Sequence, residues 1–245
     1  MEFEFDVDIR SRKNIFREFA FFCGSLFCVW ASLQFFLNYH AYSQIAAFKI
    51  QKLQTAITNQ IGNFWSEKKL QKIYIAHKSH KIEPKNNAKN VIEKIQILPS
   101  DNRLVIPRIN KNVPLINVPG HQNWYQLEQN IQKGLRNGVV VHPVSHAPSS
   151  FGNFFLTGHS SYYQWDPGRY KDVFALLHEV KTGDVIEIYW EGKKYKYKIN
   201  EKKVVDPTAV EVLRQPVDNS ILTLMTCTPI GTNKKRLILV GNLKN

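Results

Sequence analysis

One stretch near the N-terminus is apolar over its whole length and lacks the polar positions of a helix with a water-facing side. Residues 20–37 carry no charge, and the only polar side chains among them are Ser25, Ser32 and Gln34. This length reaches the lower limit for a helix that crosses the roughly 30 Å hydrocarbon core of a bilayer. The pattern predicts a transmembrane anchor over residues 19–38, preceded by a short cytoplasmic segment over residues 1–18.

The cations around this stretch predict its orientation. Four Lys or Arg residues lie between positions 10 and 17, whereas the first cation after the stretch is Lys49. Cytoplasmic flanks are enriched in Lys and Arg, so the chain after about residue 40 is expected outside the membrane. A cleaved signal peptide is the alternative, with Ala41-Tyr42-Ser43 as a loose cleavage site. The apolar stretch exceeds the ~7–15 residues usual in signal peptides, which favours an uncleaved single-pass anchor.

The chain between the anchor and residue 97 reads as a stalk followed by a linker. Residues 42–75 carry apolar side chains at helical spacing, such as Ile45, Phe48, Leu53 and Ile57. This spacing predicts an amphipathic helix that continues from the anchor. Residues 77–95 are polar and rich in Lys and Asn, which is typical of a linker. We therefore expect residues 39–97 to form an extracytoplasmic stalk and linker.

From about Leu98 the apolar residues occur in short runs, as in β structure. Pro107, Pro114 and Pro119 interrupt or follow the first two runs and predict that these strands lie at sheet edges or begin at the proline. Many short strands separated by turn residues predict a closed or nearly closed β-barrel over residues 98–245. The expected strands cover residues 104–106, 113–116, 138–142, 153–157, 185–190, 193–199, 221–226 and 236–240.

Two local patterns are more specific. Glu191-Gly192 separates two strand-like runs and predicts a tight hairpin turn, because glycine adopts the positive φ that such turns need. Asp206-Pro207 predicts the start of a short helix that continues through Leu213. In this prediction the aspartate caps the free amides of the first turn, and proline occupies the first helical position.

The net charge of +13 invites a nucleic-acid interpretation, but its distribution argues against one. Residues 1–44 carry a net charge of −1, whereas residues 45–97 and 98–245 carry +7 each. The excess is diffuse and mostly lysine, and no nucleic-acid recognition motif is present. An anionic surface, such as membrane lipid or wall polymer, is a possible partner for the segment next to the membrane.

Three residues at the ends of predicted strands could together perform acyl transfer. Cys227 is the only cysteine outside the apolar stretch, and it follows the strand at 221–226. His159 follows another strand, and Arg236 begins the last one. A thiolate attacks a carbonyl, an imidazole moves the proton, and a guanidinium stabilises the oxyanion.

Each of the three also has an ordinary structural interpretation, as a packed cysteine, a histidine in a turn or a surface cation. His142 and His146 are competing candidates for the base.

The residues around Cys227 resemble the sortase signature. Thr223-Leu224-Met225-Thr226-Cys227-Thr228-Pro229, followed by Gly231 and Arg236, matches the family's cysteine strand, loop and arginine. Leu156-Thr157-Gly158-His159 resembles its histidine strand, residues 106–110 and 113–115 look like its first two strands, and residues 205–213 match its turn and short helix. The resemblance spans about residues 98–241. It implies a mainly β fold, a sortase-type eight-stranded β-barrel with short helices.

The resemblance also implies residue roles. Cys227 would be the nucleophile, His159 the proton-transfer partner and Arg236 the stabiliser of oxyanion or substrate, with Thr226 lining the substrate site. A sortase cleaves a surface protein between Thr and Gly of an L-P-x-T-G-like sorting motif. It holds the product as a thioacyl-enzyme and transfers it to an amine acceptor, such as a cell-wall precursor. The family's catalysis is metal-free, and no acidic cluster with calcium-site spacing is evident, so no cofactor is expected.

Alternatives remain open at this point. A pilin-polymerising sortase often has a lid with an Asp-Pro-aromatic motif, but residues 41–100 contain no Asp, which favours wall anchoring. A hydrolytic cysteine protease on the same scaffold is another alternative. A third is a non-catalytic tethered barrel that binds wall polymer or a partner protein. The aromatic run from Tyr162 to Gly168 could border the cleft or form a packed surface loop.

Overall fold

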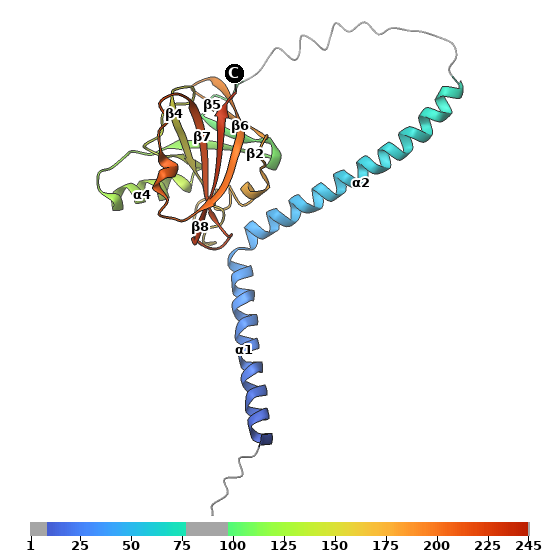
Figure 1. Cartoon of the computed structure of the whole chain (residues 1–245), viewed down its shortest axis with the longest axis vertical. Helices are drawn as coiled ribbons and strands as arrows, with labels where there is room; N and C mark the ends of the chain where they lie inside the picture. The colour runs from blue at the N-terminus through green and yellow to red at the C-terminus, as the bar shows by residue number, and fades with distance from the viewer. Residues whose placement is uncertain (1–8, 77–97, 245) are drawn as a thin grey trace, which may run out of the picture.

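The chain consists of two long helices and a β-barrel beside the bend between them (Figure 1). The computed structural model describes residues 9–76 and 98–244, with side chains from 16–60 and 98–244. Helix α1 (Ile9–Leu37) and helix α2 (Tyr39–Ala76) meet at Asn38, and we call residues 37–41 the elbow. The linker predicted for residues 77–95 lies outside the described residues.

Helix α1 contains the stretch that the sequence predicts as an anchor. Its segment Phe16–Leu37 has 22 residues and a mean hydropathy of 1.8, and none of its most apolar window is buried. It is the one helix in the described part of the chain that is long and apolar enough to cross a membrane. A helix that exposes phenylalanine and leucine on all sides needs an apolar surrounding, which a bilayer supplies.

Eight strands close into a barrel, which confirms the predicted fold class. Around the barrel the strand order is β1-β2-β3-β4-β7-β8-β6-β5, and β5 pairs with β1 to close it. The pairings of β2 with β3 and of β4 with β7 are parallel. The strands are β1 (Arg103–Ile106), β2 (Lys111–Asn117), β3 (Val139–Val141), β4 (Gly152–Thr157), β5 (Val185–Trp190), β6 (Lys193–Val205), β7 (Ser220–Thr228) and β8 (Lys235–Leu243).

The predicted edge position of the first two strands is wrong. Strand β2 contains Pro114 yet pairs with β1 on one side and β3 on the other. The proline is tolerated because the pairing with β3 begins only at Leu115, so the missing amide of Pro114 faces no partner there. Closure of the barrel leaves no edge strand.

The interior of the barrel is filled by alternate residues of the strands. Phe154 and Leu156 of β4, Leu222 and Leu224 of β7, and Leu239 of β8 all belong to one buried cluster. Inward positions thus alternate with outward positions, as the pleat of a strand requires. Since burial of apolar surface is the main favourable term in folding, this cluster positions every strand end that carries a candidate site residue.

One helix was not predicted from the sequence. Helix α4 (Trp124–Leu135) begins after Asn123, whose side chain accepts hydrogen bonds from the amides of Tyr125 and Gln126. Its residues Ile131 and Leu135 pack on the outside of the barrel against Val140. The asparagine cap and the spacing of Leu127, Ile131 and Leu135 were the available signal.

The predicted hairpin is confirmed. Strands β5 and β6 are joined by Glu191 and Gly192, which both have positive φ values of 49° and 71°. Strand β6 is longer than expected and reaches Val205, with a bulge between Ile199 and Glu201.

The predicted cap at Asp206 is wrong. Only residues Val210–Leu213 are helical, as one 3-10 turn without a side-chain cap. Asp206 instead forms an ion pair of 2.7 Å with Lys235, because the end of β6 lies beside the start of β8.

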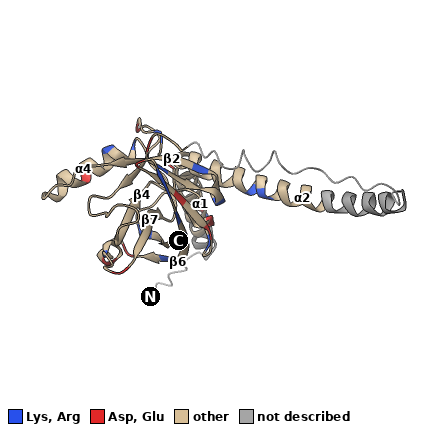
Figure 2. Ribbon diagram, turned by 90° about the horizontal axis from the view of Figure 1, so that it is seen from above, with Lys and Arg blue, Asp and Glu red and all other residues tan. Residues whose placement is uncertain are grey.

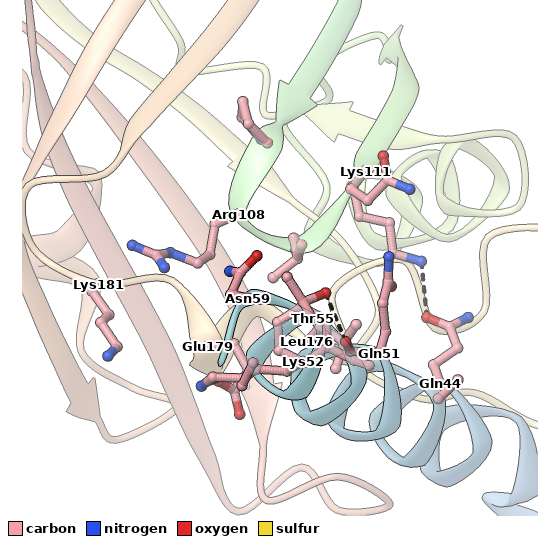
Figure 3. Close-up of a pocket in the computed structure, with 16 residues that line it drawn as sticks. Gln44, Gln51, Lys52, Thr55, Asn59, Arg108, Lys111, Leu176, Glu179 and Lys181 are labelled. Atoms are coloured by element: carbon pink, nitrogen blue, oxygen red, sulfur yellow. Dashed lines mark hydrogen bonds and ion pairs between the residues drawn. The ribbon is translucent and has the colours of Figure 1, made fainter. Parts of the chain in front are cut away.

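The first turns of α2 pack on the barrel, and the helix then runs outward from it (Figure 2). Ala41 is buried, and Ile45 and Phe48 contact the barrel's core cluster. Gln44 accepts a hydrogen bond from Lys111 at 2.8 Å and donates one to Asp172 at 2.7 Å. Further along α2 the contact opens into a hollow of about 640 Å³ between the helix and the barrel (Figure 3).

Candidate active site

Strands β4, β7 and β8 are neighbours in the barrel, and each carries one of the three predicted residues at the same end. The parallel register pairs Thr157 of β4 with Met225 of β7. His159 lies two residues beyond Thr157, and Cys227 lies two residues beyond Met225. The amide of Gly158 donates to the Met225 carbonyl at 3.2 Å, so the two chains remain paired up to the site. His159 and Cys227 therefore lie level with each other, which means at the same height along two neighbouring strands of the barrel.

Arg236 lies on the other side of Cys227. The antiparallel register of β7 and β8 pairs Cys227 directly with Arg236. Leu237, next to Arg236, and Leu224, three residues before Cys227, belong to the buried core cluster. Because successive side chains of a strand point to opposite faces, Cys227 and Arg236 project from the outer face of the barrel. Directly opposed residues have Cβ atoms about 4.5–5.5 Å apart, which places the thiol beside the guanidinium stem.

Thr226 makes a structural contact that the sequence did not predict. It is 3% exposed, and its hydroxyl donates to the Gly158 carbonyl at 2.8 Å. This hydrogen bond joins the ends of β4 and β7 between His159 and Cys227. The observed contact thus holds the two strand ends in register, and a direct contact of Thr226 with substrate remains a prediction.

His159 lies in a surrounding that keeps its imidazole neutral. The ring is half-buried and stacks on Tyr162, with ring centroids 4.2 Å apart and planes 20° apart. Burial lowers the pKa of His159 to about 4, and the nearby carboxylate of Asp166 only partly opposes this. A neutral imidazole near pH 7 can accept a proton from a thiol, which is what a general base requires.

The guanidinium of Arg236 is held by backbone oxygens. Its Nη1 donates to the carbonyls of Asn233 and Lys235 at 3.0 and 3.2 Å. Of the ion pairs in the described part of the chain, none involves Arg236. The backbone contacts orient the group, and its charge has no carboxylate partner among the side chains that the structure describes.

The sequence left open whether the aromatic loop after His159, from Tyr162 to Gly168, borders the cleft or is a packed surface loop. Asp166 anchors the loop, because it accepts from Arg136 at 2.9 and 3.0 Å and from the Gly168 amide at 2.8 Å. Ser161 accepts from the amide of Gly231 at 2.8 Å, which joins this loop to the loop between β7 and β8. The run of aromatic and turn residues was the available signal. It did not reveal these partners, which are distant in sequence.

The competing histidines lie elsewhere. The amide of His142 donates to the Phe155 carbonyl, and the amide of His146 donates to the Asn153 carbonyl. Phe155 precedes His159 by four residues along the chain, a distance of ~13 Å in an extended strand. His146 Nδ1 contacts the side-chain oxygen of Gln215 at 2.7 Å. Neither histidine is therefore level with Cys227.

A shallow hollow lies on the same outer face as Cys227. It has a volume of about 340 Å³, and Thr223, Ile238 and Val240 line it. Ile238 pairs with Met225, two residues before Cys227. None of the three candidate residues lines this hollow or the larger one under α2. No group of three or more His, Cys, Asp or Glu side chains in residues 16–60 and 98–244 is placed to hold a metal ion.

Comparisons with known proteins identify the family of this chain. A family model described as a sortase domain matches residues 104–244. Sortase A of Bacillus anthracis is 23% identical over 196 residues, which cover 80% of this chain and 83% of that protein. Sortase A of Listeria monocytogenes is 33% identical over 93 residues, or 38% of this chain and 39% of that protein.

A crystal structure of sortase C-1 from Actinomyces oris is 26% identical, with a TM-score of 0.49, and covers 67% of this chain and 83% of that chain. The family model covers more than half of the 245 residues. It includes all eight strands except Arg103, the first residue of β1. The chain belongs to the sortase family.

Proposed function

We propose that this protein is a cysteine transpeptidase that uses Cys227 as nucleophile on a sorting motif of the L-P-x-T-G type. Sortases are transpeptidases, and the arrangement of the three strand ends supports this chemistry here. The sulfur of Cys227 attacks the carbonyl carbon of the motif's threonine, and His159 takes the thiol proton. The carbonyl oxygen becomes an oxyanion, and Arg236 stabilises its charge.

Collapse of this intermediate breaks the Thr–Gly amide bond. His159 returns the proton to the departing glycine amine, and the threonine carbonyl stays on Cys227 as a thioester. An amine acceptor then attacks the thioester, His159 takes a proton from that amine, and the thiolate leaves. A new amide joins the surface protein to the acceptor, for which we propose a cell-wall precursor.

The single observation that carries this proposal is the register of three adjacent strands. Two independent pairings, Thr157 with Met225 and Cys227 with Arg236, bring a base and a cation to the two sides of one thiol. The hollow beside Ile238 lies on the same face and offers a place for the extended peptide before its scissile bond. A cysteine, a histidine or an arginine taken alone would not support the proposal.

The proposed location is the outer face of the cell membrane. Sortases are membrane-anchored, and α1 is the candidate span. The cations before this span support a cytoplasmic N-terminus, which leaves the barrel on the other side. Externally added protease should then digest the barrel in intact cells, and protection of the barrel would contradict this orientation.

Replacement of the nucleophile tests the proposed function. Cys227→Ala in the full chain should abolish cleavage of an L-P-x-T-G peptide. It should also abolish labelling by a thiol alkylator when Cys23 and Cys28, the other two free cysteines, are replaced by alanine as well. Cys28→Ala is the matched control, because it removes a thiol from α1 and leaves the barrel unchanged. Cleavage by Cys227→Ala at the native rate would contradict the proposal.

The products separate transfer from hydrolysis. With an added amine such as triglycine, a transpeptidase yields the threonyl amide, whereas a hydrolytic protease yields the free acid. A panel that includes a lysine-containing pilin-like peptide distinguishes wall anchoring from pilin polymerisation. Failure of every peptide together with failure of thiol labelling would favour a non-catalytic tethered barrel.

A further inference from the structure

Four exposed aromatic side chains surround the end of α1. Tyr39 and Tyr42 belong to the first turn of α2, where both contact the ring of Phe35. Tyr163 and Trp165 belong to the loop after β4, and their rings stack with centroids 4.8 Å apart and planes 19° apart. Trp165 is 71% exposed and Tyr163 is 55% exposed. A loop of a water-soluble surface seldom exposes two large stacked rings without a partner.

The loop is tied to the last residues of the candidate span. Gln164, between the two exposed rings, donates through Nε2 to the carbonyl of Phe36 at 3.2 Å and that of Leu37 at 3.4 Å. The last carbonyls of a helix have no partner within the helix, so Gln164 supplies one. Lys171 in turn donates to the Gln164 carbonyl at 2.7 Å. These bonds place Tyr163 and Trp165 at the level where the span ends.

The elbow also contacts the loop between β7 and β8. A Cβ atom added to Gly231 would lie 2.6 Å from Nδ2 of Asn38, so these residues are already in close contact. Gly231 lies between Cys227 and Arg236, and Tyr162 stacks on His159. The elbow therefore touches both loops that surround the candidate site, and the site end of the barrel faces the end of α1.

We propose that Tyr163 and Trp165 form a second membrane contact, which inserts into the headgroup region of the outer leaflet beside the end of α1. Tryptophan and tyrosine favour this region, because an apolar ring and a polar tip suit its two sides. Tyr39 and Tyr42 belong to the same aromatic belt. Two points of contact, the span and this loop, hold the site end of the barrel at a defined height above the bilayer. This inference rests on the proposed anchor and its orientation.

Depth-dependent fluorescence quenching tests the contact. The full chain is reconstituted into vesicles of phosphatidylcholine and phosphatidylglycerol whose acyl chains carry bromine close to the headgroup. Bromine quenches nearby tryptophans, so the quenched emission of the native chain is compared with that of Trp165→Phe. The matched control is Trp124→Phe, because Trp124 is 70% exposed on α4 and is not bonded to the elbow. Trp30→Phe reports insertion of α1.

We expect Trp165→Phe to remove a quenched component at least roughly twofold larger than any that Trp124→Phe removes, since only Trp165 lies in the interface. Equal and small changes for the two variants would overturn the contact. So would a change of Trp165 emission that requires the sorting peptide rather than the lipid. The readout needs no turnover, so an inactive chain can still show the contact. Absence of a quenched Trp30 component would contradict the anchor and the contact together, whatever the activity.

Discussion

The two ends of β4 each lie beside histidine, but the surroundings of these histidines differ. At the C-terminal end His159 is half-buried against Tyr162, level with Cys227 and beside two loops that the elbow contacts. Near the N-terminal end His146 contacts Gln215, and in the middle of the strand His142 meets Phe155 edge-on with ring centroids 5.7 Å apart. The part of the barrel around His142 and His146 therefore offers imidazoles with ordinary structural partners and no thiol among the described residues.

The difference shows how strand direction selects a site. Strands β4 and β7 are parallel, so their C-terminal ends meet at one end of the barrel, and β8 begins there because it runs the other way. Strand β3 is antiparallel to β4, so its own C-terminal end leads away from Cys227. His142 ends one predicted strand and His159 follows another, but only His159 lies at the end of the barrel that carries Cys227.

The largest expected effect is on catalysis, and it tests the difference between the two histidines directly. His159→Ala should lower kcat/KM for sorting-peptide cleavage by about 10²–10⁴, the range for loss of a general acid–base. His142→Ala should leave it nearly unchanged, because His142 lies beside Phe155 and not beside the thiol. Steady-state kinetics with both variants measures the contrast. A larger loss in His142→Ala would move the base to the other histidine.

The pH dependence of stability should also separate the two histidines. Burial holds the pKa of folded His159 at about 4, against 6.5 for an unperturbed imidazole. The unfolded chain therefore binds more protons between these values, so stability is fully present above about pH 6.5 and falls as the pH approaches 4. The full shift amounts to about 3 kcal/mol, since one pKa unit corresponds to about 1.4 kcal/mol.

Denaturant titrations of the full chain in detergent, near pH 7 and near pH 4, measure this loss. The loss should be smaller in His159→Gln, which cannot be protonated. Burial also lowers the pKa of His142, so His142→Gln serves as the comparison variant. An identical loss in the native chain and in His159→Gln would contradict the buried, neutral state of His159.

The smallest expected effect concerns two glycines at opposite ends of the barrel. Gly231 and Gly192 have similar φ values, +78° and +71°, but only Gly231 has a neighbour, Asn38, within contact distance. Gly192→Ala should cost about 1 kcal/mol, from the left-handed conformation alone. Gly231→Ala should cost more, because its Cβ also meets Asn38. Chemical denaturation measures both.

Addition of Asn38→Ala to Gly231→Ala should recover the difference between the two glycine variants and not the whole loss. Equal costs for the two single glycine variants would show that the elbow does not press on the loop between β7 and β8. The double variant thus tests the contact by which α1 and the candidate site are joined.

Much of the fold could be predicted from local patterns. The strand at 185–190 and the turn at Glu191-Gly192 follow from alternation and from glycine's tolerance of positive φ, both of which act within a few residues. Helix α4 was missed because its apolar side is narrow and its cap is a single asparagine. The predicted helix cap at Asp206 was wrong because its carboxylate binds Lys235 instead. Lys235 lies 29 residues later, too far along the chain for a local pattern to indicate the contact.

The sequence by itself determined the apolar span, the barrel class, and the cysteine, histidine and arginine that carry the resemblance to sortases, because these depend on composition, period-two alternation and short motifs. Only the tertiary structure decided that His159 rather than His142 is level with Cys227, because strand direction and register arise from pairing between distant segments. It also decided that Asn38 and Gln164 join the anchor to the loops around the site. Those contacts depend on where the bend between α1 and α2 meets the barrel, which no local pattern specifies.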